Sequence, residues 1–153
     1  MANTYTQIYI QIVIVVRNRQ CLIPDGKKSQ LYKYLTGIIQ NKYHKLLVIN
    51  GVSNHIHFLI GLNPAEALSD LIKEVKRCST NFINEQKWIN GKFSWQEGYG
   101  AFSYSRSQLD VVIKYIENQE LHHKRKTFRE EYIEMLKRFE VVYNERFIFE
   151  EVE

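Results

Sequence analysis

The sequence has few of the residues that mark exported, membrane-bound or disulfide-rich proteins. Its two cysteines, Cys21 and Cys78, lack the CxxC spacing of a thiolate zinc site and are too few for a disulfide framework. No apolar run approaches the roughly 20 residues that a membrane helix needs, and the first ten residues lack the pattern of a signal peptide. We therefore expect a soluble, cytoplasmic protein that makes no contact with a membrane.

Proline and glycine are also scarce, with two and seven residues among 153, so no flexible linker separates two parts of the chain. No internal repeat or low-complexity segment is present. We expect residues 1–153 to form a single domain. The charge is nearly balanced, with 21 basic against 17 acidic residues, which is compatible with an anionic partner but is far from a polybasic tail.

Hydrophobic periodicity predicts the element order β-α-β-β-α-β followed by two helices. The predicted strands cover residues 5–16, 46–49, 56–60 and 93–104, and the predicted helices begin near Leu31, Asn63, Ser107 and Thr127. The Asn50-Gly51 pair suits positive φ and predicts a hairpin between the second and third strands. This order is the split βαβ arrangement of ferredoxin-like domains. We expect an α+β fold, with helices on one face of an antiparallel sheet, additional C-terminal helices, and the other face open for a ligand.

The segment from Asn54 to Ile60 carries the most informative pattern. Side chains two residues apart in a strand point the same way, so His55 and His57 share one face while their neighbours anchor the strand in the core. Two imidazoles about 7 Å apart along the backbone can converge on one divalent ion. An isolated His-x-His on a strand is more often an exposed pair without a ligand, so a third ligand is required.

A second pair of polar residues occurs on the helix predicted to follow the fourth strand. Tyr115 and Gln119 have i, i+4 spacing, which places them on one helix face, away from the apolar stripe, where we expect them to face outward or toward a partner. Taken singly, each is an ordinary boundary tyrosine or surface amide. The spacing alone does not bring this helix to the histidines.

Together the two patterns resemble a known family. His55-Ile56-His57 matches the His-hydrophobic-His (HUH) motif, and residues 115–119 match the Tyr-x-x-x-Gln motif, of the small single-strand transposases of bacterial insertion sequences, the IS200-like type. The similarity runs from about Tyr5 to Phe139. It includes residues 44–51, 70–73 with 76–77, 95–103 and 128–132.

The resemblance implies a metal-dependent tyrosine (HUH) transposase. Tyr115 would attack a phosphodiester of single-stranded DNA, giving a 5′-phosphotyrosine and a free 3′-hydroxyl. His55, His57 and Gln119 would hold the divalent ion, Mg²⁺ or Mn²⁺, beside the scissile phosphate. Because the covalent intermediate stores the phosphodiester linkage, another 3′-hydroxyl can reseal the DNA without ATP, as transposition requires.

The resemblance also implies partners. Members of the family form homodimers in which the tyrosine helix can complete the site of the partner subunit, and they recognise DNA hairpins at the ends of the element. Candidate phosphate contacts in this chain are Lys73, Lys76, Arg77 and Arg106, each of which can equally be a solvated surface charge.

Two other functions compete with this interpretation. A non-enzymatic RNA-binding module of the RRM-like type would stack bases on aromatic residues of an open sheet, such as Tyr5 and Tyr9, and would need neither a metal nor Tyr115. A domesticated, repeat-associated tyrosine transposase would keep all four site residues and differ only in its DNA target. The absence of an added C-terminal binding region favours the insertion-sequence enzyme.

Overall fold

A computed structural model of the chain describes residues 3–19, 22–123, 126–144 and 148, so that Cys21 lies outside the described residues. Its centre is an antiparallel sheet of four strands in the order β2-β3-β1-β4. The strands are β1 (Tyr9–Val15), β2 (Lys45–Val52), β3 (His55–Gly61) and β4 (Gly100–Tyr104). This order and the alternation with helices confirm the ferredoxin-like α+β fold expected from the periodicity.

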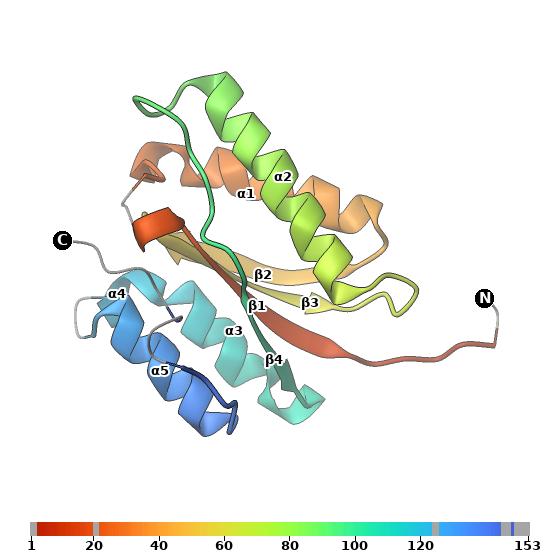
Figure 1. Ribbon diagram of the computed structural model, residues 1–153. Coiled ribbons are helices and arrows are strands. Elements are labelled where there is room, and N and C mark those ends of the chain that lie inside the picture. Colours follow the sequence, from red (N-terminus) through yellow and green to blue (C-terminus); the bar gives the residue numbers. More distant parts are fainter. Residues whose placement is uncertain (1–2, 20–21, 124–125, 145–147, 149–153) are drawn as a thin grey trace.

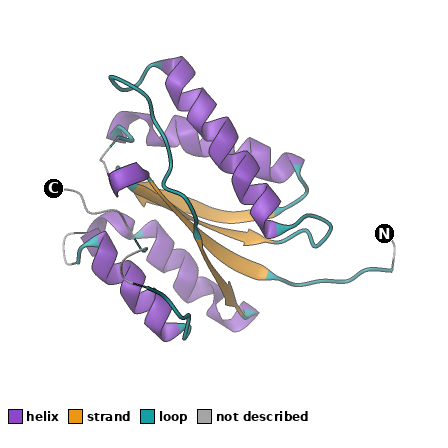
Figure 2. Ribbon diagram, in the orientation of Figure 1, coloured by secondary structure: helices purple, strands orange, loops and turns teal. Residues whose placement is uncertain are grey.

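Helices cover both faces of the sheet (Figure 1). One face carries α1 (Lys28–Asn41) and α2 (Leu68–Gln86); the other carries α3 (Leu109–Glu117), α4 (Gln119–His123) and α5 (Phe128–Arg138). Figure 2 shows the strands as a middle layer between these two groups of helices. Within the described residues, no helix combines the length and hydrophobicity required to cross a bilayer.

The second helical layer corrects the expectation of an open sheet face. Val13 and Val15 of β1 pack against α5, and Leu59 of β3 packs against α3. A central strand with apolar side chains on both faces must be covered on both, because each fully buried Val or Leu side chain contributes about 1.5–3 kcal/mol relative to an exposed one. The C-terminal helices therefore cover the surface on which we expected a ligand.

The helices α1 and α2 pack on the sheet and form the larger of the hydrophobic clusters with it. Ile12 and Ile14 point to this side of β1, opposite Val13 and Val15, as the period of two along the strand requires. The buried helical residues that meet them recur at helical spacing: Leu31, Leu35 and Ile39 on α1, with Leu71, Ile72, Val75 and Ile83 on α2. The alternation predicted for the first strand is thus confirmed, although residues 5–8 lie outside the sheet.

Two predicted boundaries were wrong. The second long helix begins at Leu68 rather than at Asn63, because the Asn63 side chain accepts a hydrogen bond from the Ala65 amide in a turn, and Glu66 pairs with His44 and Lys42. The fourth strand begins only at Gly100.

The hairpin between β2 and β3 forms, but it turns at Ser53 and Asn54 rather than at Asn50-Gly51. Gly51 lies inside β2, paired with Ile56, and its φ is not positive. A Cβ added there would collide with the His55 carbonyl oxygen and come within 2.9 Å of the Ile56 Cα. The glycine is therefore required for close approach of the two backbones.

Replacing Gly51 with alanine should destabilise the protein by about 2–3 kcal/mol, because the two strands must separate at the point where His55 is attached. Thermal unfolding followed by circular dichroism measures the loss. The matched control is Gly37→Ala on the exposed side of α1, where no atom lies within 4 Å of the added Cβ. This variant should be stabilised by about 0.5–1 kcal/mol, and equal behaviour of the two variants would contradict the packing argument.

Candidate active site

The two histidines of β3 point into the layer formed by α3 and α5, and neither has exposed surface. Their ring centroids are 5.0 Å apart, and Phe128 of α5 stacks on His55 with a centroid distance of 3.7 Å. The expectation that the pair lies on an uncovered surface is therefore corrected. Burial removes the imidazoles from water, so their nitrogens must find partners inside the protein.

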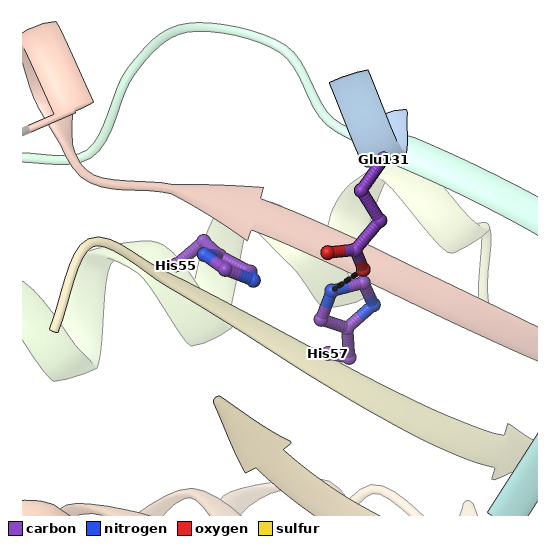
Figure 3. Close-up of side chains that lie close together, drawn as sticks. All are labelled: His55, His57 and Glu131. Carbon is purple, nitrogen blue, oxygen red and sulfur yellow. Dashed lines mark ion pairs between the residues drawn. The ribbon is translucent and has the colours of Figure 1, made fainter. Parts of the chain in front are cut away.

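A third group, Glu131 of α5, meets the histidines from above (Figure 3). One ligand atom from each of His55, His57 and Glu131 lies within 4.8 Å of the others. Within this cluster, His57 Nε2 lies 3.3 Å from Glu131 Oε1. The sequence interpretation missed Glu131 as a site residue. A signal was present, because this carboxylate falls on the buried helix stripe between Phe128 and Met135, where an acid is rare unless it has a partner.

Gln119 also contacts this cluster, but from a different helix than expected. Its Oε1 lies 3.1 Å from His55 Nε2, and the residue is fully buried. Gln119 was expected on one helix with Tyr115, facing outward or toward a partner. Instead α3 ends at Glu117, Gln119 begins α4, and its side chain is buried inside this chain. The break between the two helices directs the amide toward the histidines.

Tyr115 lies beside this cluster within the same chain. Its ring centroid is 5.9 Å from that of His57, and its hydroxyl donates a hydrogen bond to Glu131 Oε1. The tyrosine also lines a pocket of about 760 Å³ between α3 and α5. The end of α3 is held to the sheet by Asn50, whose Nδ2 donates to the carbonyl oxygens of Ile116 and Glu117 at 3.0 Å each.

Burial and mutual contact together set the pKa values of Tyr115 and Glu131. Burial and the neighbouring carboxylate both raise the pKa of the Tyr115 hydroxyl well above its ordinary value. Burial alone would raise the pKa of Glu131 as well, but the contacts with His57 and Tyr115 outweigh it and lower that pKa to about 2. The resting site thus holds a carboxylate next to a firmly protonated phenol.

Replacing Glu131 with glutamine should lower the pKa of Tyr115, because the negative charge that disfavours the phenolate is removed while the side-chain shape is kept. Alkaline titration of the near-ultraviolet phenolate absorbance measures this, with the double variant that also carries Tyr115→Phe subtracted as background. Glu134→Gln is the control, because that carboxylate lies one turn further along α5 and pairs with Lys126. An unchanged Tyr115 titration in Glu131→Gln would contradict the assigned cause.

The donor set fits a divalent cation. It comprises imidazole nitrogens, a carboxylate and an amide oxygen, a mixture that accepts Mg²⁺ or Mn²⁺. Among the described residues, His57 Nε2 and Glu131 Oε2 are buried without a hydrogen-bond partner. Such atoms are costly to bury unless a ligand completes them.

The four basic candidates lie away from this cluster. Lys73, Lys76 and Arg77 belong to α2 on the opposite face of the sheet, and Arg106 precedes α3. Lys76 donates to the carbonyl oxygens of Gln96 and Gly98, and Arg77 pairs with Glu74. Lys73 and Arg106 are exposed.

Comparisons with known proteins agree with this fold. A crystal structure of a candidate transposase from Deinococcus radiodurans R1 superposes with a TM-score of 0.61 at 19% identity, covering 76% of this chain and 94% of that one. A REP-associated tyrosine transposase, solved bound to a REP hairpin, superposes with a TM-score of 0.62 at 13% identity, covering 93% of this chain and 90% of that one. No curated protein matches the sequence at a significant level. The family model described as "Transposase IS200 like" matches residues 4–119, which is most of the chain and includes both histidines, Tyr115 and Gln119. The chain therefore belongs to the IS200-like transposase family.

Proposed function

We propose that this transposase cleaves and rejoins single-stranded DNA through a covalent 5′-phosphotyrosine at Tyr115. The observation that carries the proposal is the convergence of the Tyr115 hydroxyl, the His55–His57 pair and Glu131 within one chain. A nucleophile beside a cluster able to bind a cation is the arrangement that phosphodiester cleavage requires, because the attacked phosphate gains negative charge in the transition state.

In the cleavage step the Tyr115 oxygen forms a bond to phosphorus, and the bond from phosphorus to the 3′-oxygen breaks. The phenol loses its proton, and the departing 3′-oxygen gains one to become a hydroxyl. Glu131 already accepts the hydrogen bond of the phenol, so it is placed to receive the proton as the new bond forms. Attack by the 3′-hydroxyl of another strand reverses these bond changes and releases Tyr115, which joins DNA without ATP.

The cation would be held by His55, His57 and Gln119, as the sequence motifs imply, together with Glu131. When bound, Mg²⁺ or Mn²⁺ would supply electrostatic stabilisation of the phosphate oxygens. The remaining tasks belong to the chain. Asn50 holds the end of the tyrosine helix against β2, and Glu131 orients the phenol by accepting its hydrogen bond.

The DNA would enter through the pocket between α3 and α5, which opens beside Tyr115. The histidines have no exposed surface, so Phe128 has to move off His55 before a phosphate can reach the imidazoles. The same covering by α3 and α5 argues against the RNA-binding alternative, because bases cannot stack on a sheet face that helices occupy.

The proposed DNA substrate is a single strand that carries a hairpin. The structural neighbour bound to a REP hairpin supports this class of ligand. The hairpin could come from two kinds of DNA, the ends of an insertion sequence or a dispersed repeat. We retain the homodimer as part of the proposal, although in this chain Tyr115 already lies beside the histidines of its own sheet. Lys73, Lys76, Arg77 and Arg106 remain proposed phosphate contacts outside the site.

The test incubates the protein with labelled single-stranded oligonucleotides that carry hairpins from the flanks of its own gene or from nearby repeats, in the presence of Mg²⁺. A covalent adduct that survives a denaturing gel is the expected result, with a free 3′-hydroxyl on the released fragment. Tight hairpin binding without any adduct would overturn the enzymatic proposal in favour of a binding module.

A further inference from the structure

His57 has a second polar neighbour on the side away from Glu131. Its Nδ1 lies 2.9 Å from the side-chain Nε2 of Gln11 on β1. The other end of this amide, Oε1, accepts a hydrogen bond of 2.8 Å from the Tyr104 hydroxyl on β4. Gln11 and His57 are both fully buried, so water does not compete for these contacts. A polar chain thus crosses three neighbouring strands and ends on a proposed ligand.

The position of Gln11 is set by the sheet register. Val13 of β1 pairs with His57, and Gln11 pairs with Leu59, so Gln11 is the diagonal neighbour of His57 on the same face. Apart from His57 and Tyr104, its neighbours on this face include the apolar side chains of Val13, in the cluster under α5, and Leu59, in the cluster under α3. Burying an amide costs free energy unless it is hydrogen-bonded, so a glutamine at this position suggests a specific role for its polar group.

The ligation chemistry of histidine supplies the reason. The nitrogen that binds a cation must carry no proton, so a neutral His57 that ligates through Nε2 holds its proton on Nδ1. That N–H group needs an acceptor, and the Gln11 amide occupies the position. The oxygen and nitrogen of an amide exchange places on rotation by half a turn, and the two orientations occupy almost the same space.

Each amide orientation matches one tautomer of His57. With Nε2 of Gln11 toward the ring, as in the structure, Nδ1 accepts and the ring proton lies on the nitrogen nearest Glu131. With Oε1 toward the ring, Nδ1 donates and His57 Nε2 is free to bind a cation. The Tyr104 hydroxyl suits both orientations, because it donates to an oxygen in the first and accepts from an amide in the second.

We propose that Gln11 is a positioning residue that selects the ligating tautomer of His57, and that Tyr104 holds the Gln11 amide in place. This inference rests on the metal site of the proposed function. The two orientations of the amide differ in which ring nitrogen of His57 they leave for the N–H group. An amide serves here better than a carboxylate, because it can present a donor or an acceptor and adds no second negative charge beside Glu131.

The test measures Mn²⁺ affinity by electron paramagnetic resonance on the full chain, without DNA. Gln11→Met keeps the length of the side chain but removes the strong acceptor, and it should weaken Mn²⁺ binding about 10- to 100-fold. Gln11→Glu restores an acceptor for the Nδ1 proton and should return the affinity to within a few-fold of the unmodified protein. Gln40→Met, an exposed change on α1, is the matched control and should leave the affinity unchanged.

A second readout separates positioning from general damage to the fold. Side-chain ¹⁵N spectra of histidine distinguish the two tautomers, and the Mg²⁺-loaded protein should show His57 with its proton on Nδ1. In Tyr104→Phe, which removes only a hydroxyl from the polar chain, the same signal should broaden or shift toward a mixture of tautomers. Gln11→Met and Tyr104→Phe should both keep the circular dichroism spectrum of the parent.

The outcomes distinguish the inference from the proposed function. A folded Gln11→Met variant that binds Mn²⁺ as tightly as the parent would overturn the role of Gln11 and leave the metal site standing. A Mg²⁺-loaded parent with its His57 proton on Nε2 would overturn the role of Gln11 and also the ligation of the cation by this nitrogen. A parent protein that binds no Mn²⁺ at all would overturn the metal site and this inference together.

Discussion

Replacing Tyr115 with phenylalanine should abolish the proposed covalent protein–DNA adduct and should lower strand cleavage by at least about 1,000-fold, because the oxygen that would bond to phosphorus is missing. The ring itself is kept, so its edge contact with the His57 ring should remain. The hydrogen bond to Glu131 is lost, but the variant should still fold and bind hairpin DNA. The measurement is adduct formation on a denaturing gel, with binding followed separately by fluorescence anisotropy.

The control for this substitution is Tyr43→Phe. Tyr43 is 84% exposed at the end of α1, away from the helices that carry the site, and its variant should form the adduct at the parental rate. An adduct that persists in Tyr115→Phe would show that another nucleophile acts, and the proposed mechanism would fail. Loss of DNA binding together with cleavage would point instead to a role of the hydroxyl in binding.

Local sequence patterns predicted the sheet and the shared strand face of the two histidines. The period of two along β3 predicted that His55 and His57 share one face, and the structure confirms this. The prediction is possible because the alternation of side chains along a strand depends only on neighbouring residues. The helix start expected near Thr127 likewise matches α5, where the Thr127 side chain accepts a hydrogen bond from the Glu130 amide. Signals of this kind are local, so they survive without knowledge of the tertiary structure.

The composition of the site could not be obtained in the same way. Whether a strand face is open or covered depends on where the C-terminal helices pack, and no pattern within β3 reports this. Glu131 is 74 residues beyond His57 in the sequence and joins it only through the docking of α5. Gln119 was expected on a continuous helix, whereas the break after Glu117 turns it inward. Each of these errors concerns a long-range contact.

The position of Glu131 also separates two parts of the proposed site. The region that matches the family model ends at residue 119, so it contains the histidines, Tyr115 and Gln119 but not α5. Glu131 and Phe128, which contact the histidines from α5, lie beyond it. The residues matched by the family model therefore include the proposed nucleophile and three proposed ligands, whereas the carboxylate and the covering aromatic ring come from α5, outside the matched residues.

Replacing His57 with alanine should weaken Mn²⁺ binding by more than about 100-fold and reduce adduct formation to the level seen in EDTA. The loss of a direct ligand should exceed the 10- to 100-fold typical of a residue that only supports one. It also leaves Glu131 without its imidazole neighbour, so the pKa of this carboxyl should rise from about 2. Mn²⁺ binding by electron paramagnetic resonance and the gel assay for the adduct measure the two effects on the same preparation.

The matched control is His44→Gln, at a buried histidine that pairs with Glu66 and takes no part in the cluster. This variant should bind Mn²⁺ like the parent, even if its melting temperature falls. His55→Ala should behave like His57→Ala, because both imidazoles lie in the same cluster with Glu131. If adduct formation survives both EDTA and His57→Ala, the buried histidines are structural, and the phosphate must instead be stabilised by charges elsewhere on the chain.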